Sequence, residues 1–283
     1  MIQKYLAGSL QVEHLRIPIA GLPPHLAGTK LVQLSDFHYD GLRLSDGLLK
    51  QAIATANSLE PDLIFLTGDY ITDDPRPITG LAKHLAHLKP KVGVYAVLGN
   101  HDLRWRGARE KVQHSLESAK VCVLWNEVCF PMGDGLAVVG LADYWSEEFQ
   151  PDLVFAQLDP AIPRLVLSHN PDTAAVMTHW RIDLQLSGHT HGGQVVLPSI
   201  GPVIGKLHQW RKQYLPAWHE RCEKIVEHWE WSAGLYQVGK NWLYTNRGLG
   251  TYFPGRLFCP PELTVFTLEV APHKPATPVP LTL

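Results

Sequence analysis

Acidic, amide and imidazole side chains gather in five short stretches of the sequence, SDFH, TGD, GNHD, SHNP and SGHTH. Two pairs within them, Asp36 with His38 and His189 with His191, are two residues apart, so on an extended backbone both members point to one face. Each pair could hold one metal ion. The candidate residues are Asp36, His38, Asp69, Asn100, His101, Asp102, His169, His189 and His191.

The mixture of carboxylate, amide and imidazole groups favours borderline divalent metals such as Mn, Fe or Zn over the all-oxygen sites of Ca and the thiolate sites of structural Zn. Two such ions about 3.5–4 Å apart, sharing one carboxylate and one hydroxide, can bind a phosphate and present the hydroxide for in-line attack. Asp69 stands alone after its strand, which makes it the predicted bridge. We therefore predict a dinuclear centre that cleaves a phosphoester or pyrophosphate bond by a metal-bridged hydroxide.

The oxygen that leaves the phosphorus needs a proton, and His101 is the predicted donor. It lies between Asn100, which could ligate a metal, and Asp102, which could hold the imidazole in one tautomer and favour its charged form. Arg104, Arg247 and Arg256 could each hold a substrate phosphate, because a guanidinium matches phosphate oxygens. Ion pairs or contacts with carbonyl groups explain these arginines at least as well.

Short apolar runs precede all five stretches, at 31–34, 63–66, 92–98, 164–167 and 183–186. Helical patterns at 45–59, 77–87 and 109–119 alternate with the first three runs, which indicates βαβ units with parallel strands. Ligands of open α/β sheets bind beyond the carboxyl ends of the strands, so the five stretches should converge on one edge. Glycines at 68, 99 and 188 should let the backbone turn sharply there.

The second half of the chain has a different pattern of apolar runs. From Val121 the runs VCVL, VCF and LAVVGL follow one another closely, which is more typical of antiparallel strands, and further runs occur at 194–197, 235–238, 242–245 and 263–270. We therefore expect a mixed sheet arrangement within one domain, 1–283. The segment 271–283 is rich in Pro and Thr and is predicted to be a loose tail.

Residues 206–233 interrupt the strands with a helical insertion, which Pro216 should split into two helices. One interpretation packs the apolar stripe of these helices on the sheets. The other makes them an aromatic lid beside the metals, which takes up an acyl chain or lies at a bilayer interface. The apolar residues, spaced three or four apart, are Leu207, Trp210, Tyr214, Leu215, Trp218, Cys222, Ile225, Val226 and Trp229.

Composition excludes several classes of protein. With 25 Lys and Arg against 27 Asp and Glu and 45% hydrophobic residues, the 283-residue chain is neither disordered nor a strongly basic nucleic-acid binder. It lacks an apolar run of about 18 residues and an uninterrupted signal sequence, so we expect a cytoplasmic protein, with peripheral membrane contact through 206–233 as the alternative. Its four cysteines form no C-x-x-C pair, which argues against a disulfide framework or structural zinc. The oligomeric state stays open.

The ordered set D-x-H, GD, GNHD, H and GHTHGGQ resembles the calcineurin-like metallophosphoesterases over nearly the whole chain. The GHTHGGQ ending and YTNRGLGTYFPGRLFCPPELTVFTL are similar to a bacterial subgroup of membrane-associated phosphodiesterases that includes UDP-diacylglucosamine pyrophosphatases. The resemblance implies an α/β fold, a four-layer αββα sandwich of two mixed β-sheets flanked by helices. It also implies that one metal is held by Asp36, His38, Asp69 and His191, and the other by Asp69, Asn100, His169 and His189.

The predicted substrate is a lipid-linked or nucleotide-linked phosphodiester, or another phosphorylated small molecule. A phosphomonoesterase or phosphoprotein phosphatase is the second possibility, and a non-catalytic scaffold that binds metal is the third. Retention of His101 with the full ligand set argues against a scaffold, which has no use for a proton donor. The subgroup often carries an amino-terminal membrane segment, which we do not find here, and its insertion is usually shorter than 206–233.

Overall fold

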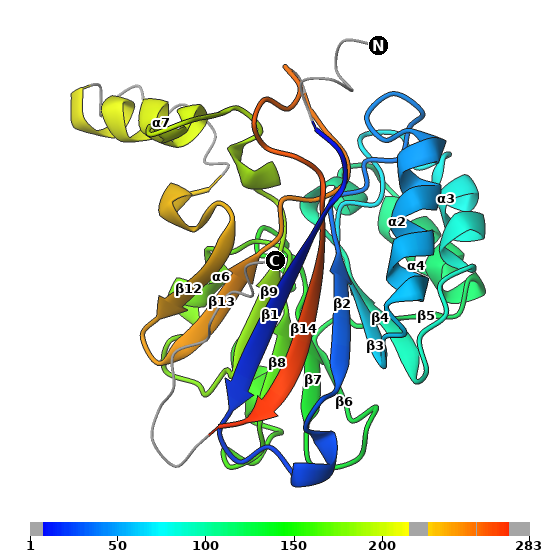
Figure 1. Ribbon diagram of the computed structural model, residues 1–283, viewed down its shortest axis with the longest axis vertical. Coiled ribbons are helices and arrows are strands. Elements are labelled where there is room, and N and C mark those ends of the chain that lie inside the picture. Colours follow the sequence, from blue (N-terminus) through cyan, green and yellow to red (C-terminus); the bar gives the residue numbers. More distant parts are fainter. Residues whose placement is uncertain (1–7, 215–225, 253, 272–283) are drawn as a thin grey trace.

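Two six-stranded sheets pack face to face in the computed structural model, which describes residues 8–214, 226–252 and 254–271 (Figure 1). The first sheet contains, in spatial order, β1 (Gln11–Ile19), β14 (Glu262–Val270), β2 (Lys30–Leu34), β3 (Leu63–Thr67), β4 (Gly93–Val97) and β5 (Val121–Val123). The second contains β12 (Gly234–Val238), β13 (Asn241–Thr245), β9 (Leu184–Ser187), β8 (Arg164–Leu167), β7 (Ala137–Gly140) and β6 (Glu127–Cys129).

Helices cover the outer face of each sheet. Helices α2 (Asp46–Ser58), α3 (Ile78–Leu85) and α4 (Ala108–Ser118) pack on the first sheet, and α5 (Pro151–Phe155) and α6 (Thr173–Val176) pack on the second. A third apolar core, which includes Phe65, Leu165, Leu184 and Phe266, fills the space between the sheets. The predicted four-layer sandwich is therefore confirmed.

The strands that lead to the predicted site are buried on both sides. Every residue of β3, β8 and β9 is buried. Burial on both faces explains the apolar run of β3, whereas β9 also buries Gln185 and Ser187, and the amide of Gln185 donates to the hydroxyl of Ser187. Strands β2 to β5 are parallel, and helices connect them. Helix α2 begins where the hydroxyl of Ser45 accepts the N–H of Leu48.

Three features of the second half differ from the prediction. Only β6 and β12 are antiparallel to their neighbours in the second sheet, because β13, β9, β8 and β7 run parallel. Strand β5 joins β4 in the first sheet instead of pairing with β6. The run 194–197 is reduced to β10 (Val196–Leu197), which pairs with β11 (Gly201–Pro202).

Strand β1 was not predicted. It pairs in parallel with β14 along its full length and lies at the edge of the first sheet. Leu15, Ile17 and Ile19 are buried and alternate with more exposed residues, so a period of two was present in the sequence.

Helix α7 (Val203–Tyr214) forms the first part of the predicted insertion and projects at the end of the molecule where β2, β3 and β4 finish (Figure 1). Gly205 and His208 pack beside Trp229, whereas Leu207, Trp210 and Tyr214 point outward, and Trp210 and Tyr214 are 50% and 60% exposed. The interpretation that this apolar stripe packs on the sheets is therefore wrong for α7. Residues 215–225 of the second predicted helix and the tail 272–283 lie outside the described residues. The described end of the insertion contains the short helix η4 (Trp229–Trp231), and Val226 and Trp229 are buried there.

No helix within the described ranges is both long enough and apolar enough to cross a bilayer.

Candidate metal centre

The predicted ligands meet where strands from both sheets end. Asp36 and His38 follow β2, Asp69 follows β3, and Asn100 begins the short helix η2 (Asn100–Leu103) after β4. His169 follows β8, and the segment after β9 contributes the remaining two. Six of these side chains are buried, namely Asp36, His38, Asp69, His169, His189 and His191.

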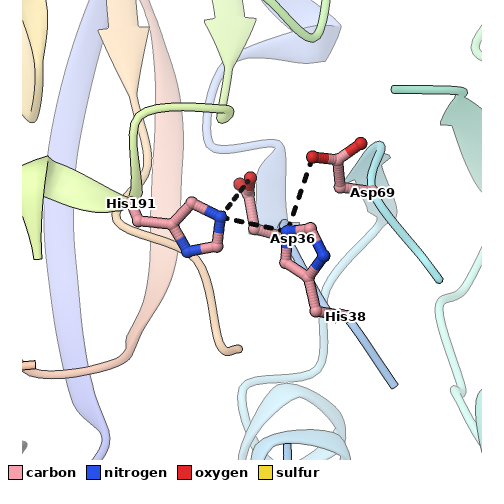
Figure 2. Close-up of side chains that lie close together, drawn as sticks. All are labelled: Asp36, His38, Asp69 and His191. Atoms are coloured by element: carbon pink, nitrogen blue, oxygen red, sulfur yellow. Dashed lines mark hydrogen bonds and ion pairs between the residues drawn. The ribbon is translucent and has the colours of Figure 1, made fainter. Parts of the chain in front are cut away.

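One group of ligand atoms comes from Asp36, His38, Asp69 and His191, and all four atoms lie within 4.8 Å of one another (Figure 2). The Nε2 atom of His38 is 3.0 Å from Nε2 of His191 and 3.5 Å from Oδ2 of Asp69. Atoms that each bind one ion at about 2.0–2.2 Å have this kind of spacing. Burial lowers the pKa of His38 to about 3 and that of His191 well below its usual value, so both rings are neutral and carry a lone pair.

A second group contains Asp69, His169 and His189. Nε2 of His169 lies 3.2 Å from Oδ2 of Asp69 and 3.3 Å from Nδ1 of His189. Oδ1 of Asn100 is buried beside them and has no hydrogen-bond partner among the described residues, as an oxygen reserved for a metal would be. The same oxygen of Asp69 therefore faces both groups, and the donor set fits two ions.

Hydrogen bonds from other parts of the chain orient these ligands. Nδ1 of His169 donates to the carbonyl of Thr67 at 2.7 Å, which leaves Nε2 for the metal. The carboxylate of Asp36 accepts the N–H of His189, and Oδ1 of Asp69 accepts the N–H of His101, both at 2.9 Å. These contacts connect the strand ends of the two sheets before any ion binds.

The pKa values of Asp69 and His169 depend on each other's charge. Burial by itself acts to raise the pKa of Asp69, but nearby histidines, His169 first, hold that pKa well below its usual value. For His169, burial acts to lower the pKa, and the opposing charge of Asp69 raises it to about 10. Asp69 is thus ionised, the form that a bridging ligand requires.

Five of the candidate ligands have left-handed backbone conformations. Their φ angles are 51° at Asp36, 43° at His38, 55° at Asp69, 70° at His189 and 52° at His191. Residues with a Cβ atom rarely adopt this conformation, and each costs about 1–3 kcal/mol. The surrounding structure therefore holds these side chains against a local preference.

The three glycines at the strand ends have different tasks. Gly68 has a φ of 96° and needs the freedom of glycine, as predicted. Gly99 and Gly188 leave space instead, because a Cβ atom would lie 2.3 Å from Oδ1 of Asp69 at the first position and 2.2 Å from Oδ2 of Asp36 at the second.

The predicted contact between Asp102 and the imidazole of His101 is wrong. Nδ1 of His101 lies 2.6 Å from the carbonyl of Thr72. A carbonyl only accepts, so Nδ1 carries a proton and Nε2 is left for proton transfer.

The carboxylate of Asp102 instead binds backbone. It is fully buried and accepts N–H groups from Gly99, Asp69, Tyr70 and Ile71 at 2.9–3.2 Å. These donors belong to the loops after β3 and β4, so Asp102 holds the loop of the bridging residue to the loop of Asn100.

Two of the three predicted phosphate-binding arginines have structural roles. Arg256 is buried and donates to the carbonyls of Arg247 and Gly248, among others. Arg247 forms ion pairs with Glu13 and Glu262 at 2.6 Å. Only Arg104 lines the cavity at the metal ligands, and it pairs there with Asp73 at 2.7 Å.

That cavity has a volume of about 970 Å³ and includes residues that the motifs did not reveal. Tyr252 contributes its ring, and Trp145 lies edge to face with His189, 4.9 Å between ring centroids. Asp143 is buried, and burial raises its pKa to about 6. The run 136–141 ends just before Asp143, so the same strand-end rule could have found this residue.

Comparisons with known proteins agree with this geometry. The family model described as calcineurin-like phosphoesterase matches residues 29–193. The chain is 33% identical over 261 residues to phosphodiesterase YaeI of Escherichia coli, which covers 90% of this chain and 88% of that protein. It is 28% identical over 292 residues to UDP-2,3-diacylglucosamine pyrophosphatase LpxG of Chlamydia muridarum, which covers 85% and 84%.

A solved dimetal phosphatase from Danio rerio shares the fold with a TM-score of 0.52, at 13% identity, over 86% of this chain and 93% of that one. The family match covers more than half of the chain and contains all seven candidate ligands. The chain therefore belongs to the calcineurin-like phosphoesterase family and is a metal-dependent phosphoric ester hydrolase.

Proposed function

We propose that this enzyme is a phosphodiesterase or pyrophosphatase for a lipid-linked or nucleotide-linked substrate. Asp36, His38, Asp69 and His191 would hold one divalent ion, and Asp69, Asn100, His169 and His189 the other. The observation that carries this assignment is the position of Oδ2 of Asp69, which lies 3.5 Å from Nε2 of His38 and 3.2 Å from Nε2 of His169.

When bound, two divalent ions supply Lewis acidity and make water nucleophilic at neutral pH. The chain supplies the remaining functions. The N–H of His101 fixes the carboxylate of Asp69, and the carbonyl of Thr67 fixes the ring of His169. Nε2 of His101 donates a proton to the oxygen that leaves the phosphorus, while Nδ1–H stays on the carbonyl of Thr72. Arg104 lies at the cavity wall, where its guanidinium can bind a second anionic group.

The size of the cavity supports a large substrate. Its volume of about 970 Å³ is near the upper end of the roughly 300–1,000 Å³ found for ligand sites. A phosphomonoester of a small alcohol would leave most of this space empty. The relatives named as a phosphodiesterase and as a pyrophosphatase for a diacylated sugar nucleotide support the same substrate class.

The apolar residues beside the cavity also favour an amphiphilic substrate. Ile204 of α7 and Trp229 line the metal cavity, and Trp229 also lines a second cavity of about 390 Å³ together with Ile200 and Phe258. The outward apolar side chains of α7 are suited to a bilayer interface, where Trp and Tyr are favoured. We propose peripheral contact with the cytoplasmic side of a membrane through this helix.

A hydrolysis panel on protein reconstituted with Mn or Zn tests the substrate class. We expect a soluble aryl diester and a nucleotide-diphosphate lipid to be cleaved at least about tenfold faster than the matching aryl monoester, since about 1.4 kcal/mol of differential binding gives that ratio. Equal or faster cleavage of the monoester would overturn the diesterase assignment in favour of a phosphomonoesterase.

A further inference from the structure

Tyr252 belongs to no ligand group, yet its side chain contacts the candidate ligand His38 and the candidate proton donor His101. Its hydroxyl oxygen is 3.3 Å from Nδ1 of His101, and the two ring centroids are 5.3 Å apart. Its ring also stands edge to face against His38, with 5.0 Å between centroids and an interplanar angle of 87°. A ring in this position restricts the rotation of the imidazole of His101.

Two separate segments hold Tyr252 in place. The guanidinium carbon of Arg43 lies 4.7 Å from the ring centroid, a cation–π contact. Arg43 is in turn fixed by an ion pair with Asp40. On the backbone side, Oε1 of Gln194 accepts the N–H of Tyr252 and the hydroxyl of Thr251.

Asp40 connects this arrangement to the other partner of His101. The hydroxyl of Thr72 donates to Oδ2 of Asp40 at 3.2 Å, and the carbonyl of the same Thr72 accepts from Nδ1 of His101. One carboxylate therefore fixes both Thr72 and, through Arg43, Tyr252. Nδ1 of His101 contacts both of these fixed groups.

We propose that Tyr252 is a positioning residue for His101, supported by Arg43 and Asp40. It closes one side of the imidazole and keeps Nε2 directed at the leaving oxygen. In the step concerned, the Nε2–H bond breaks and an O–H bond forms on that oxygen as its bond to phosphorus breaks. The inference rests on the proposed role of His101 as proton donor.

Leaving-group dependence distinguishes a positioning role from general packing. We would measure kcat and KM of the full-length, metal-loaded Tyr252→Leu and Tyr252→Phe variants on diesters whose leaving groups run from 4-nitrophenol to an alkyl alcohol. We expect Tyr252→Leu to lower kcat about 10–100-fold for the alkyl leaving group, part of the 10²–10⁴ that a positioned acid contributes. For 4-nitrophenol the loss should stay below about threefold, because a good leaving group needs no proton. KM and metal content should not change, and Tyr252→Phe should show a smaller loss.

Three further variants control this test. Arg43→Met keeps an unbranched apolar stem, removes the cation and should show the same dependence more weakly. Tyr95→Phe, in β4 and outside the cavity, should match the parent enzyme. His101→Gln combined with Tyr252→Leu should be no slower than His101→Gln alone, since both changes affect one function.

Equal losses for all leaving groups, or additive losses in the double variant, would overturn the positioning role of Tyr252. A His101→Gln variant that is itself insensitive to the leaving group would overturn the proposed proton donor and the role of Tyr252 with it. A sensitive His101→Gln variant with an insensitive Tyr252→Leu variant would overturn only the latter.

Discussion

The candidate metal centre and helix α7 lie at the same end of the molecule but differ in their physical character. Six of the seven ligand side chains are buried, and hydrogen bonds from both sheets fix the ligands. Helix α7 has little buried surface, and its apolar side chains face outward. The metal centre can determine the reaction, and helix α7 can determine whether the substrate is taken from a lipid phase. Variants of the centre should therefore affect every substrate, and variants of α7 only lipid-linked ones.

The largest effect should come from Asp69→Ala. Without the shared carboxylate, two cations would face each other unscreened. We expect metal content to fall from about two ions per chain to one or none, and activity to be lost on all substrates. Elemental analysis after dialysis against Mn checks this, with Asp74→Ala, an exposed carboxylate in the same loop, as the control. Retention of both ions would contradict the bridge.

His101→Gln should separate chemistry from metal binding. We expect it to keep both ions and to lower kcat about 10²–10⁴-fold, with the loss shrinking for better leaving groups. Elemental analysis and kinetics on the aryl and alkyl diesters provide the measurement. Equal impairment on both would exclude His101 as the donor.

Asp102→Asn should instead weaken the scaffold of the centre. An amide oxygen accepts less strongly than a carboxylate, and its NH₂ group would face backbone donors. We expect unfolding free energy to fall by about 1.5–3 kcal/mol and metal affinity about 10–100-fold, with no dependence on the leaving group. Denaturant unfolding and metal titration measure both quantities. Asp62→Asn, whose carboxylate accepts from Lys30 before β3, is the matched control for stability. If the loss of activity in Asp102→Asn depended on the leaving group as it does in His101→Gln, the result would instead support the predicted contact of Asp102 with the imidazole.

The smallest and most selective effect should come from α7. Replacing Leu207 and Trp210 together by Ser should reduce turnover of a lipid-linked substrate in anionic vesicles about tenfold, because a tenfold ratio corresponds to about 1.4 kcal/mol, which partial burial of these two side chains at the interface can supply. A soluble aryl diester should be cleaved as before. Leu153→Ser removes an exposed leucine from α5 and is the control. Equal losses on both substrates, or no change on either, would make α7 a structural element.

The motif spacing was sufficient to predict which side chains meet, because ligands at the ends of adjacent strands converge wherever the strands are parallel. It was insufficient for Asp102, whose donors at 69–71 are more than thirty residues away and use backbone N–H groups that every sequence provides. Arg247 was unpredictable for a similar reason. Its partners, Glu13 and Glu262, lie in β1 and β14, and β1 was not recognised as a strand.

The left-handed backbone conformations of the five ligands affect which substitutions are favoured at these positions during evolution. Each costs about 1–3 kcal/mol, against a total stability of about 5–15 kcal/mol for a typical protein. Catalysis is the reason to keep Asp36, His38, Asp69, His189 and His191 in this conformation. A descendant that no longer needed metal would gain stability from glycine or asparagine at these positions, because both residues adopt positive φ angles more easily. Relatives with such replacements at these positions should therefore be inactive as hydrolases and harder to unfold.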